Sequence, residues 1–125
     1  MVKELTASNF NETIENNDIV LVDFWANWCG PCRTFKPVFE AAAERHPEMV
    51  FTSCDTEAQP DLAGAFGIRS IPTLMVFRER VLLYAQPGAL PSEALENLIE
   101  QVKNLDMAVV HAEVAKQEQE KAANA

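Results

Sequence analysis

Short apolar runs alternate along the chain with segments in which apolar residues have helical spacing. Ile19–Trp25 has the sequence Ile-Val-Leu-Val-Asp-Phe-Trp, and Met49–Cys54 and Thr73–Phe77 are two further short apolar runs. Nearly continuous apolar runs of this length are typical of strands buried on both faces, as in parallel sheets. Helices are predicted over residues 8–16, from the first cysteines to about residue 46, over residues 61–66 and from residue 92 onward.

The last strand of a five-stranded sheet is predicted over Val81–Tyr84, directly after Thr73–Phe77. Only Arg78–Arg80 separates the two runs, and so short a link permits only an antiparallel hairpin. Upstream, alternating strands and helices predict parallel pairing. The predicted order is β, α, β, α, β, α, β, β, α, which is an α/β fold with a mixed sheet and helices on both of its faces.

The end of the chain departs from this pattern. Residues 106–125 are rich in Ala, Gln, Glu and Lys and contain neither Gly nor Pro, so we divide the chain into a domain over 1–105 and an extension over 106–125. A 3-4-3-4-3 spacing predicts one apolar seam on a helix that continues to about residue 114; its members are Leu95, Leu98, Val102, Leu105, Val109 and Ala112. Three outcomes stay open: a frayed extension, packing back on the domain, or contact with a partner or second copy.

Length and composition place the chain among ordinary globular proteins. Its 125 residues predict one domain, and 48% hydrophobic with 23% charged residues excludes a disordered chain, a collagen or a disulfide-dense scaffold. No apolar run approaches the roughly 18 residues of a membrane span. The formal net charge of −9 repels phosphate groups, so neither nucleic acid nor an anionic membrane is expected as a partner.

The cysteines bear on location as well as on chemistry. Met1–Phe10 lacks the apolar stretch of a secretory signal, and three cysteines are an odd number for a disulfide framework. We therefore expect a cytoplasmic protein. In that compartment a Cys-x-x-Cys pair is catalytic or metal-binding rather than structural.

Residues 28–32, Trp-Cys-Gly-Pro-Cys, carry the candidate chemistry. They follow a buried strand and begin a helix, where cysteines at i and i+3 have Cα atoms about 5–6 Å apart, within disulfide range. Cys29 lies at the helix N-terminus, where the helix dipole favours a thiolate. We expect Cys29 to attack a substrate disulfide and the less exposed Cys32 to resolve the mixed disulfide.

A zinc site is the alternative for this pair. Cys54 would be the third ligand and His46 or His111 the fourth. The sequence has no second Cys-x-x-Cys and no His-x₃₋₅-His. Cys54 is more simply a small buried residue, and His46 a cation at a helix C-terminus.

Asp23 interrupts the apolar run of the first buried strand. An unpaired carboxylate is costly to bury, so we expect burial to raise its pKa. Either it meets a buried water or hydroxyl group, or it accepts the proton of the resolving thiol. We favour the second role, because so costly a buried residue beside a thiol pair is hard to explain by structure alone.

The chain resembles a thioredoxin in three places. These are residues 23–32, residues 67–73 with the sequence Gly-Ile-Arg-Ser-Ile-Pro-Thr, and Pro37, which lies five residues after the second cysteine. The resemblance covers about residues 2–105. It implies a thioredoxin fold, in which a central sheet is flanked by four helices, and a cytosolic protein-disulfide reductase. It also implies a monomer without a bound cofactor, recharged by thioredoxin reductase with electrons from NADPH. The Gly-Pro dipeptide is like that of reducing members.

The resemblance further implies a cis peptide bond before Pro72, which would lie against the cysteine pair. A substrate backbone would then cross a shallow apolar surface. The residues that would form it are Trp28, Gly30, Pro31, Ile71, Pro72 and Gly88.

Three features depart from the family. The strand that would carry a lysine beside the buried Asp in many thioredoxins has none, so the pKa of Asp23 is expected to be higher. Pro87 replaces a small apolar residue before Gly88 and removes an N–H from the binding rim. The extension over 106–125 is the third departure.

Three functions remain to be compared. They are a general disulfide reductase, a reductant dedicated to one partner such as a peroxiredoxin, and an adaptor that binds through its extension.

Overall fold

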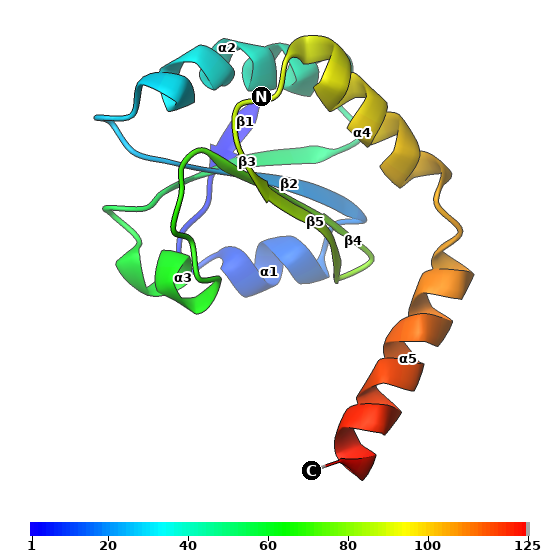
Figure 1. Ribbon diagram of the computed structural model, residues 1–125. Helices are drawn as coiled ribbons and strands as arrows, with labels where there is room; N and C mark the ends of the chain where they lie inside the picture. The colour runs from blue at the N-terminus through cyan, green and yellow to red at the C-terminus, as the bar shows by residue number, and fades with distance from the viewer. Residues whose placement is uncertain (125) are drawn as a thin grey trace.

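A five-stranded mixed sheet forms the centre of the structure, a computed structural model that describes residues 1–124 (Figure 1). The strands lie in the order β1-β3-β2-β4-β5. Their bounds are β1 Val2–Glu4, β2 Ile19–Trp25, β3 Val50–Asp55, β4 Thr73–Arg78 and β5 Val81–Pro87. β1 and β2 run parallel to β3, while β4 is antiparallel to both β2 and β5. The predicted parallel core with an antiparallel hairpin is confirmed.

Helices cover both faces of the sheet. Their bounds are α1 Phe10–Glu15, α2 Gly30–Arg45, α3 Pro60–Ala65, α4 Ser92–Asn104 and α5 Met107–Ala123. α2 and α4 lie on one face, α1 and α3 on the other, and α5 points away from the sheet (Figure 1). The four flanking helices agree with the prediction. α1, however, begins at Phe10 after Asn9, two residues later than predicted.

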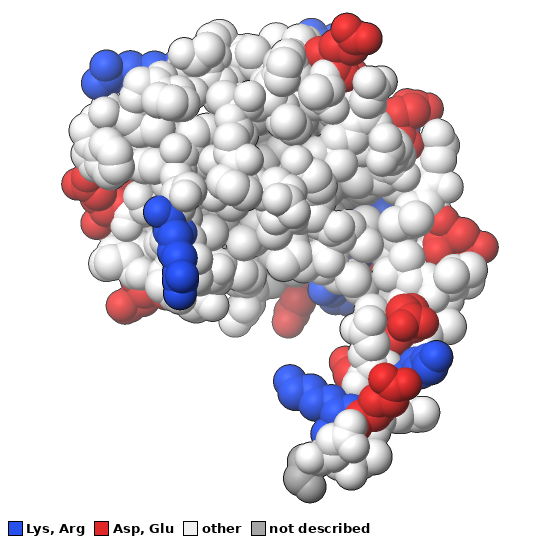
Figure 2. All heavy atoms as spheres, in the orientation of Figure 1, with Lys and Arg blue, Asp and Glu red and all other residues white. Residues whose placement is uncertain are grey.

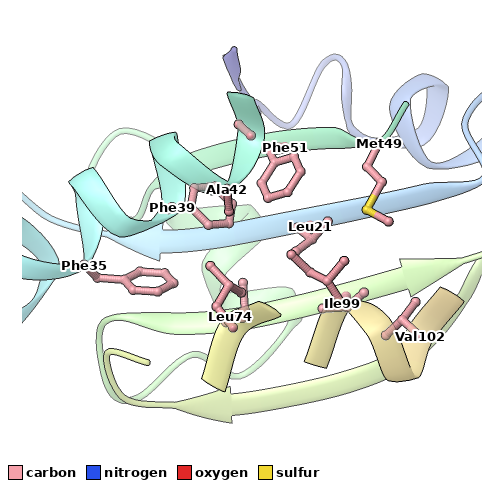
Figure 3. Packing of buried hydrophobic residues seen from close by; sticks show 12 residues of the cluster. Leu21, Phe35, Phe39, Ala42, Met49, Phe51, Leu74, Ile99 and Val102 are labelled. Carbon is pink, nitrogen blue, oxygen red and sulfur yellow. The ribbon is translucent and has the colours of Figure 1, made fainter. Parts of the chain in front are cut away.

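The side chains of β2 point alternately to the two faces of the sheet, and a separate cluster of buried hydrophobic residues covers each face. Leu21 packs with residues of α2 and α4, among them Phe35, Phe39 and Ile99 (Figure 3). Val22, its neighbour, belongs to the cluster on the opposite face. Because successive strand residues point to opposite faces, Asp23 shares the face of Leu21 and lies under α2.

The apolar seam does not run along one continuous helix. α4 ends at Asn104, and Leu105 is extended, with ψ of 136°. The guanidinium of Arg78 donates hydrogen bonds to the carbonyl oxygens of Val102 at 2.8 Å and Leu105 at 3.0 Å. Asp106 then begins a new helix, because its side chain accepts a hydrogen bond from the Ala108 N–H at 3.0 Å. Leu105 and Val109, both placed on the seam by the pattern, are exposed.

The extension is helical and packs on the domain through its first turns. Met107 is only 6% exposed, and Val110, His111 and Val114 on the same helix face are half-buried. His111 Nε2 lies 2.8 Å from a carboxylate oxygen of Glu79, in the turn between β4 and β5. The second half of α5 projects from the domain and bears charges of both signs (Figure 2). No helix in residues 1–124 is both long and apolar enough to cross a membrane.

Candidate active site

The cysteine pair lies where β2 leads into α2. Cys29 is the N-cap of α2, with extended backbone angles, and Pro31 occupies its first turn. Cys29 and Cys32 form a disulfide with their Cα atoms 5.3 Å apart, as the spacing predicts. The Cys32 N–H donates a hydrogen bond to the Cys29 sulfur at 3.1 Å. This donor and the positive end of the helix dipole therefore both lie at the Cys29 sulfur.

The exposure of the two cysteines differs from the expectation. Both are 4% exposed in the disulfide form, so Cys32 is not the less accessible residue. Their surroundings distinguish them instead. The Cys29 sulfur lies 3.6 Å from the carbonyl oxygen of Ile71, while Cys32 faces the pocket that holds Asp23.

The loop before β4 lies against Cys29. The Ile71–Pro72 peptide bond is cis, as the resemblance implies. The carbonyl oxygen of Pro72 accepts a hydrogen bond from the Gly88 N–H at 2.8 Å, which places the end of β5 beside this loop. Gly88 has a φ of 113°, a backbone conformation that favours glycine.

The side chains on the outer rim are accessible. Trp28 is 68% exposed, Gly30, Pro31 and Gly88 are exposed, Ile71 is half-buried and Pro72 is buried. The six residues of the expected binding surface thus lie on segments that meet at Cys29. Sequence reasoning missed Glu57, whose carboxylate accepts a hydrogen bond from the Trp28 indole N–H. That contact joins residues far apart in the chain, and no local pattern indicates it.

Asp23 is buried without a partner. It is 4% exposed, and among the described residues its Oδ1 atom has no hydrogen-bond partner. Burial raises the pKa of Asp23 from 3.8 to about 7. Its register partner on β3 is Ser53, a short neutral residue, so the high pKa agrees with the expectation drawn from the missing lysine.

A pocket of about 470 Å³ opens beside this carboxyl group. Asp23 and Ser53 line it from the sheet, and α2 lines it from the other side, including Cys32. The other lining residues are Val2, Trp25, Ala26, Asn27, Arg33, Lys36, Phe39 and Glu40. Asp23 and Cys32 therefore line the same pocket.

The structure does not bring the candidate zinc ligands together. Cys54 is fully buried in the cluster on the opposite face of the sheet, and burial, with Asp55 nearby, raises the pKa of its thiol to about 11. His46 is the C-cap of α2, as expected, and lies 2.7 Å from a Glu96 oxygen on α4. Within residues 1–124, no group of three or more His, Cys, Asp or Glu side chains could hold a metal ion.

The disulfide lies at the N-terminus of α2, beside the loop that contains Pro72, on a sheet with the strand order β1-β3-β2-β4-β5. Together these features define a thiol–disulfide oxidoreductase. The family model described as thioredoxin matches residues 1–101. The chain belongs to the thioredoxin family.

Relatives and solved structures agree with this assignment. The chain is 58% identical over 115 residues to "Putative thioredoxin 2" of Streptomyces coelicolor, covering 92% of this chain and 86% of the relative. It is 42% identical over 100 residues to "Thioredoxin" of Porphyra purpurea, covering 78% and 94%. A mutant thioredoxin from Halobacterium salinarum superposes with a TM-score of 0.77 at 32% identity, covering 83% of this chain and 92% of that one. A Plasmodium falciparum thioredoxin gives a TM-score of 0.74 at 34% identity, covering 80% and 98%.

Proposed function

We propose that this thioredoxin-family oxidoreductase is a general protein-disulfide reductase in which Cys29 is the nucleophile. The observation that carries the proposal is the position of Cys29 at the N-cap of α2, where its sulfur accepts a hydrogen bond from the Cys32 N–H. A negative sulfur is stabilised at this position and not at Cys32, one turn into the helix.

The reaction has two exchanges. The Cys29 thiolate attacks a substrate disulfide, forms the mixed disulfide and releases the first substrate sulfur as a thiolate. The Cys32 sulfur then attacks Cys29, forms the Cys29–Cys32 disulfide and releases the second substrate sulfur. Two electrons pass to the substrate, which becomes a dithiol, and the protein ends in the disulfide form described above.

Asp23 is the proposed acceptor of the Cys32 proton. It shares the pocket with Cys32, and with a pKa of about 7 it is divided between its two protonation states near neutral pH. That balance is what a general base needs at this pH. We expect Asp23→Asn to slow substrate release from the mixed disulfide between about pH 7 and 8, and the two proteins to converge at pH 6, where Asp23 is protonated.

The substrate chain is proposed to lie across the surface around Cys29. Trp28 supplies an exposed apolar face there, and Gly30 and Pro31 leave room for an approaching backbone. Ile71, Pro72 and Gly88 form the opposite side. Since Pro87 has no N–H, the strand end beside Gly88 offers one donor fewer to a bound peptide.

Thioredoxin reductase is the proposed electron donor, with NADPH as the source of electrons, and the chain itself needs no bound cofactor. The family supports this partner and disulfide-containing protein substrates. We further propose a monomer that works in the cytoplasm. Its net charge of −9 repels phosphate groups, so nucleic acid and anionic membranes are not proposed as partners. The catalytic domain is proposed to span residues 1–105 and the extension 106–125.

Insulin reduction coupled to NADPH through a thioredoxin reductase tests this function. The full chain should sustain many turnovers, because the reductase restores the dithiol after each one. Cys29→Ser is the control and should give none. Insulin reduction with dithiothreitol but none through thioredoxin reductase would contradict the proposed electron donor, and no reduction with either would contradict the function.

A reductant or adaptor dedicated to one partner is the second candidate, with binding through the extension. The alignment with the Streptomyces relative spans 115 residues, more than the first 105, so it necessarily includes part of the extension. Removing residues 106–125 distinguishes the two functions. A general reductase keeps its activity on insulin, whereas an adaptor loses its partner in a pull-down.

A further inference from the structure

Apart from Asp23 itself, the charged residues that line the pocket all come from α2. The sheet contributes Asp23 and the neutral Ser53, β1 contributes Val2, and the loop after β2 contributes Ala26 and Asn27. The other titratable or charged groups that line it are Cys32, Arg33, Lys36 and Glu40, all from α2. Whatever charge acts on Asp23 through this pocket therefore comes from α2.

Two of these groups, Lys36 and Glu40, follow Cys32 along one face of α2. The guanidinium of Arg33 is held by a 2.7 Å hydrogen bond to the Asn27 carbonyl oxygen, and since that acceptor is neutral, the charge of Arg33 remains as a constant background. Lys36 follows Cys32 by four residues and Glu40 follows Lys36 by four, so the three share one face of α2. Both Lys36 and Glu40 are exposed, and neither forms a salt bridge with any residue in 1–124.

We propose that Lys36 and Glu40 are positioning residues for the resolving step, because their opposite charges at the mouth of the pocket set how readily Asp23 ionises beside Cys32. The proposal rests on the proposed role of Asp23 as proton acceptor. A cation at the mouth favours the carboxylate and an anion disfavours it. Burial is the cause of the raised pKa of Asp23, and in this proposal the two charges adjust that pKa in opposite directions.

The pocket makes this coupling effective. Oδ1 of Asp23 has no hydrogen-bond partner among the described residues, so no nearer polar group decides its charge. The sheet side of the pocket has a low dielectric constant, so it screens the interaction between Asp23 and a nearby charge less than bulk water does. As Cys32 attacks the mixed disulfide, its proton moves to the Asp23 carboxylate, and Lys36 stabilises that carboxylate before the transfer.

The test compares two neutralising variants of the full-length disulfide form. The carboxyl carbon of Asp23 is followed by ¹³C NMR as a function of pH. Lys36→Gln should raise the pKa of Asp23 by about half a unit and Glu40→Gln should lower it by a similar amount, the order expected for one unit charge across a pocket open to water. Lys36→Arg keeps the charge and should restore the wild-type titration.

Glu44→Gln is the matched control, since it neutralises an exposed carboxylate one turn further along α2, outside the pocket. Its effect on Asp23 should be much smaller than that of Glu40→Gln. The shifts caused by Lys36→Gln and Glu40→Gln should shrink in 1 M salt, where the screening length is about 3 Å. The pH midpoint of substrate release from the mixed disulfide should move with the Asp23 titration in both variants.

Shifts of the same sign in the two variants, or shifts no larger than that of Glu44→Gln, would overturn the proposal. So would a release midpoint that stays fixed while the Asp23 titration moves. The role of Asp23 itself is judged separately, because Asp23→Asn with wild-type release at pH 7 to 8 contradicts the proposed function whatever Lys36 does.

Discussion

Replacing Asp23 by Asn should stabilise the oxidised protein, and by an amount that grows with pH. The folded protein keeps the Asp23 proton up to about pH 7, whereas 3.8 is the ordinary value that applies in the unfolded chain. Between these values the unfolded state binds fewer protons than the folded state, so the free energy of unfolding falls as pH rises. A separation of about three pKa units corresponds to about 4 kcal/mol.

The gain from Asp23→Asn therefore follows a defined curve. The part of the gain that comes from the Asp23 titration should be about 0.5 kcal/mol at pH 4, about 3 kcal/mol at pH 6 and about 4 kcal/mol at pH 8. Burying the Asn amide carries a cost that lowers the gain by the same amount at every pH, because the amide does not titrate. Urea unfolding of the disulfide form at these three pH values measures the curve. Asp61→Asn makes the same chemical change at an exposed position and should alter stability by less than about 0.5 kcal/mol. A gain that is constant between pH 4 and 8, or that falls with pH, would refute the reasoning.

Two further predictions concern residues outside the active site. Cys54→Ala should leave insulin reduction unchanged and lower stability by about 1–2 kcal/mol, since it leaves a small cavity, and iodoacetamide should not modify Cys54 in the native protein. A large loss of activity would show a redox role for that thiol. Removal of residues 106–125 should also preserve insulin reduction but cost about 2 kcal/mol, because Met107 is buried. Met107→Ala in the full chain should reproduce most of this loss in urea unfolding, and an unchanged stability would mean that α5 does not pack on the domain in solution.

Local signals account for what the sequence predicted well. β2 is a nearly continuous apolar run, and residues 28–32 follow it directly, so the strand, the helix start and the cysteine pair could all be placed. The hairpin of β4 and β5 followed from a link too short for any other connection. Asp23 was expected to be buried because it interrupts an apolar strand, and the structure places it beneath α2 beside Cys32.

Contacts between distant residues account for what the sequence did not predict. The break between α4 and α5 depends on Arg78, which binds the last carbonyls of α4 from the end of β4. An apolar spacing that continues through Leu105 gives no sign of that contact. The pocket likewise depends on the register that pairs Asp23 with Ser53 and on the position of α2 above them.

The separate roles of the two cysteines are the centre of the account, and trapping of the mixed disulfide tests them most directly. Cys32→Ser and Cys29→Ser, each in reduced form, are incubated with oxidised insulin, and the adducts are digested and mapped by mass spectrometry. Cys32→Ser should accumulate insulin attached through Cys29, because the attacking thiolate remains and nothing resolves the adduct. Cys29→Ser should trap nothing. Insulin attached through Cys32 in the Cys29→Ser protein, with none on Cys29 in the other, would contradict the assignment.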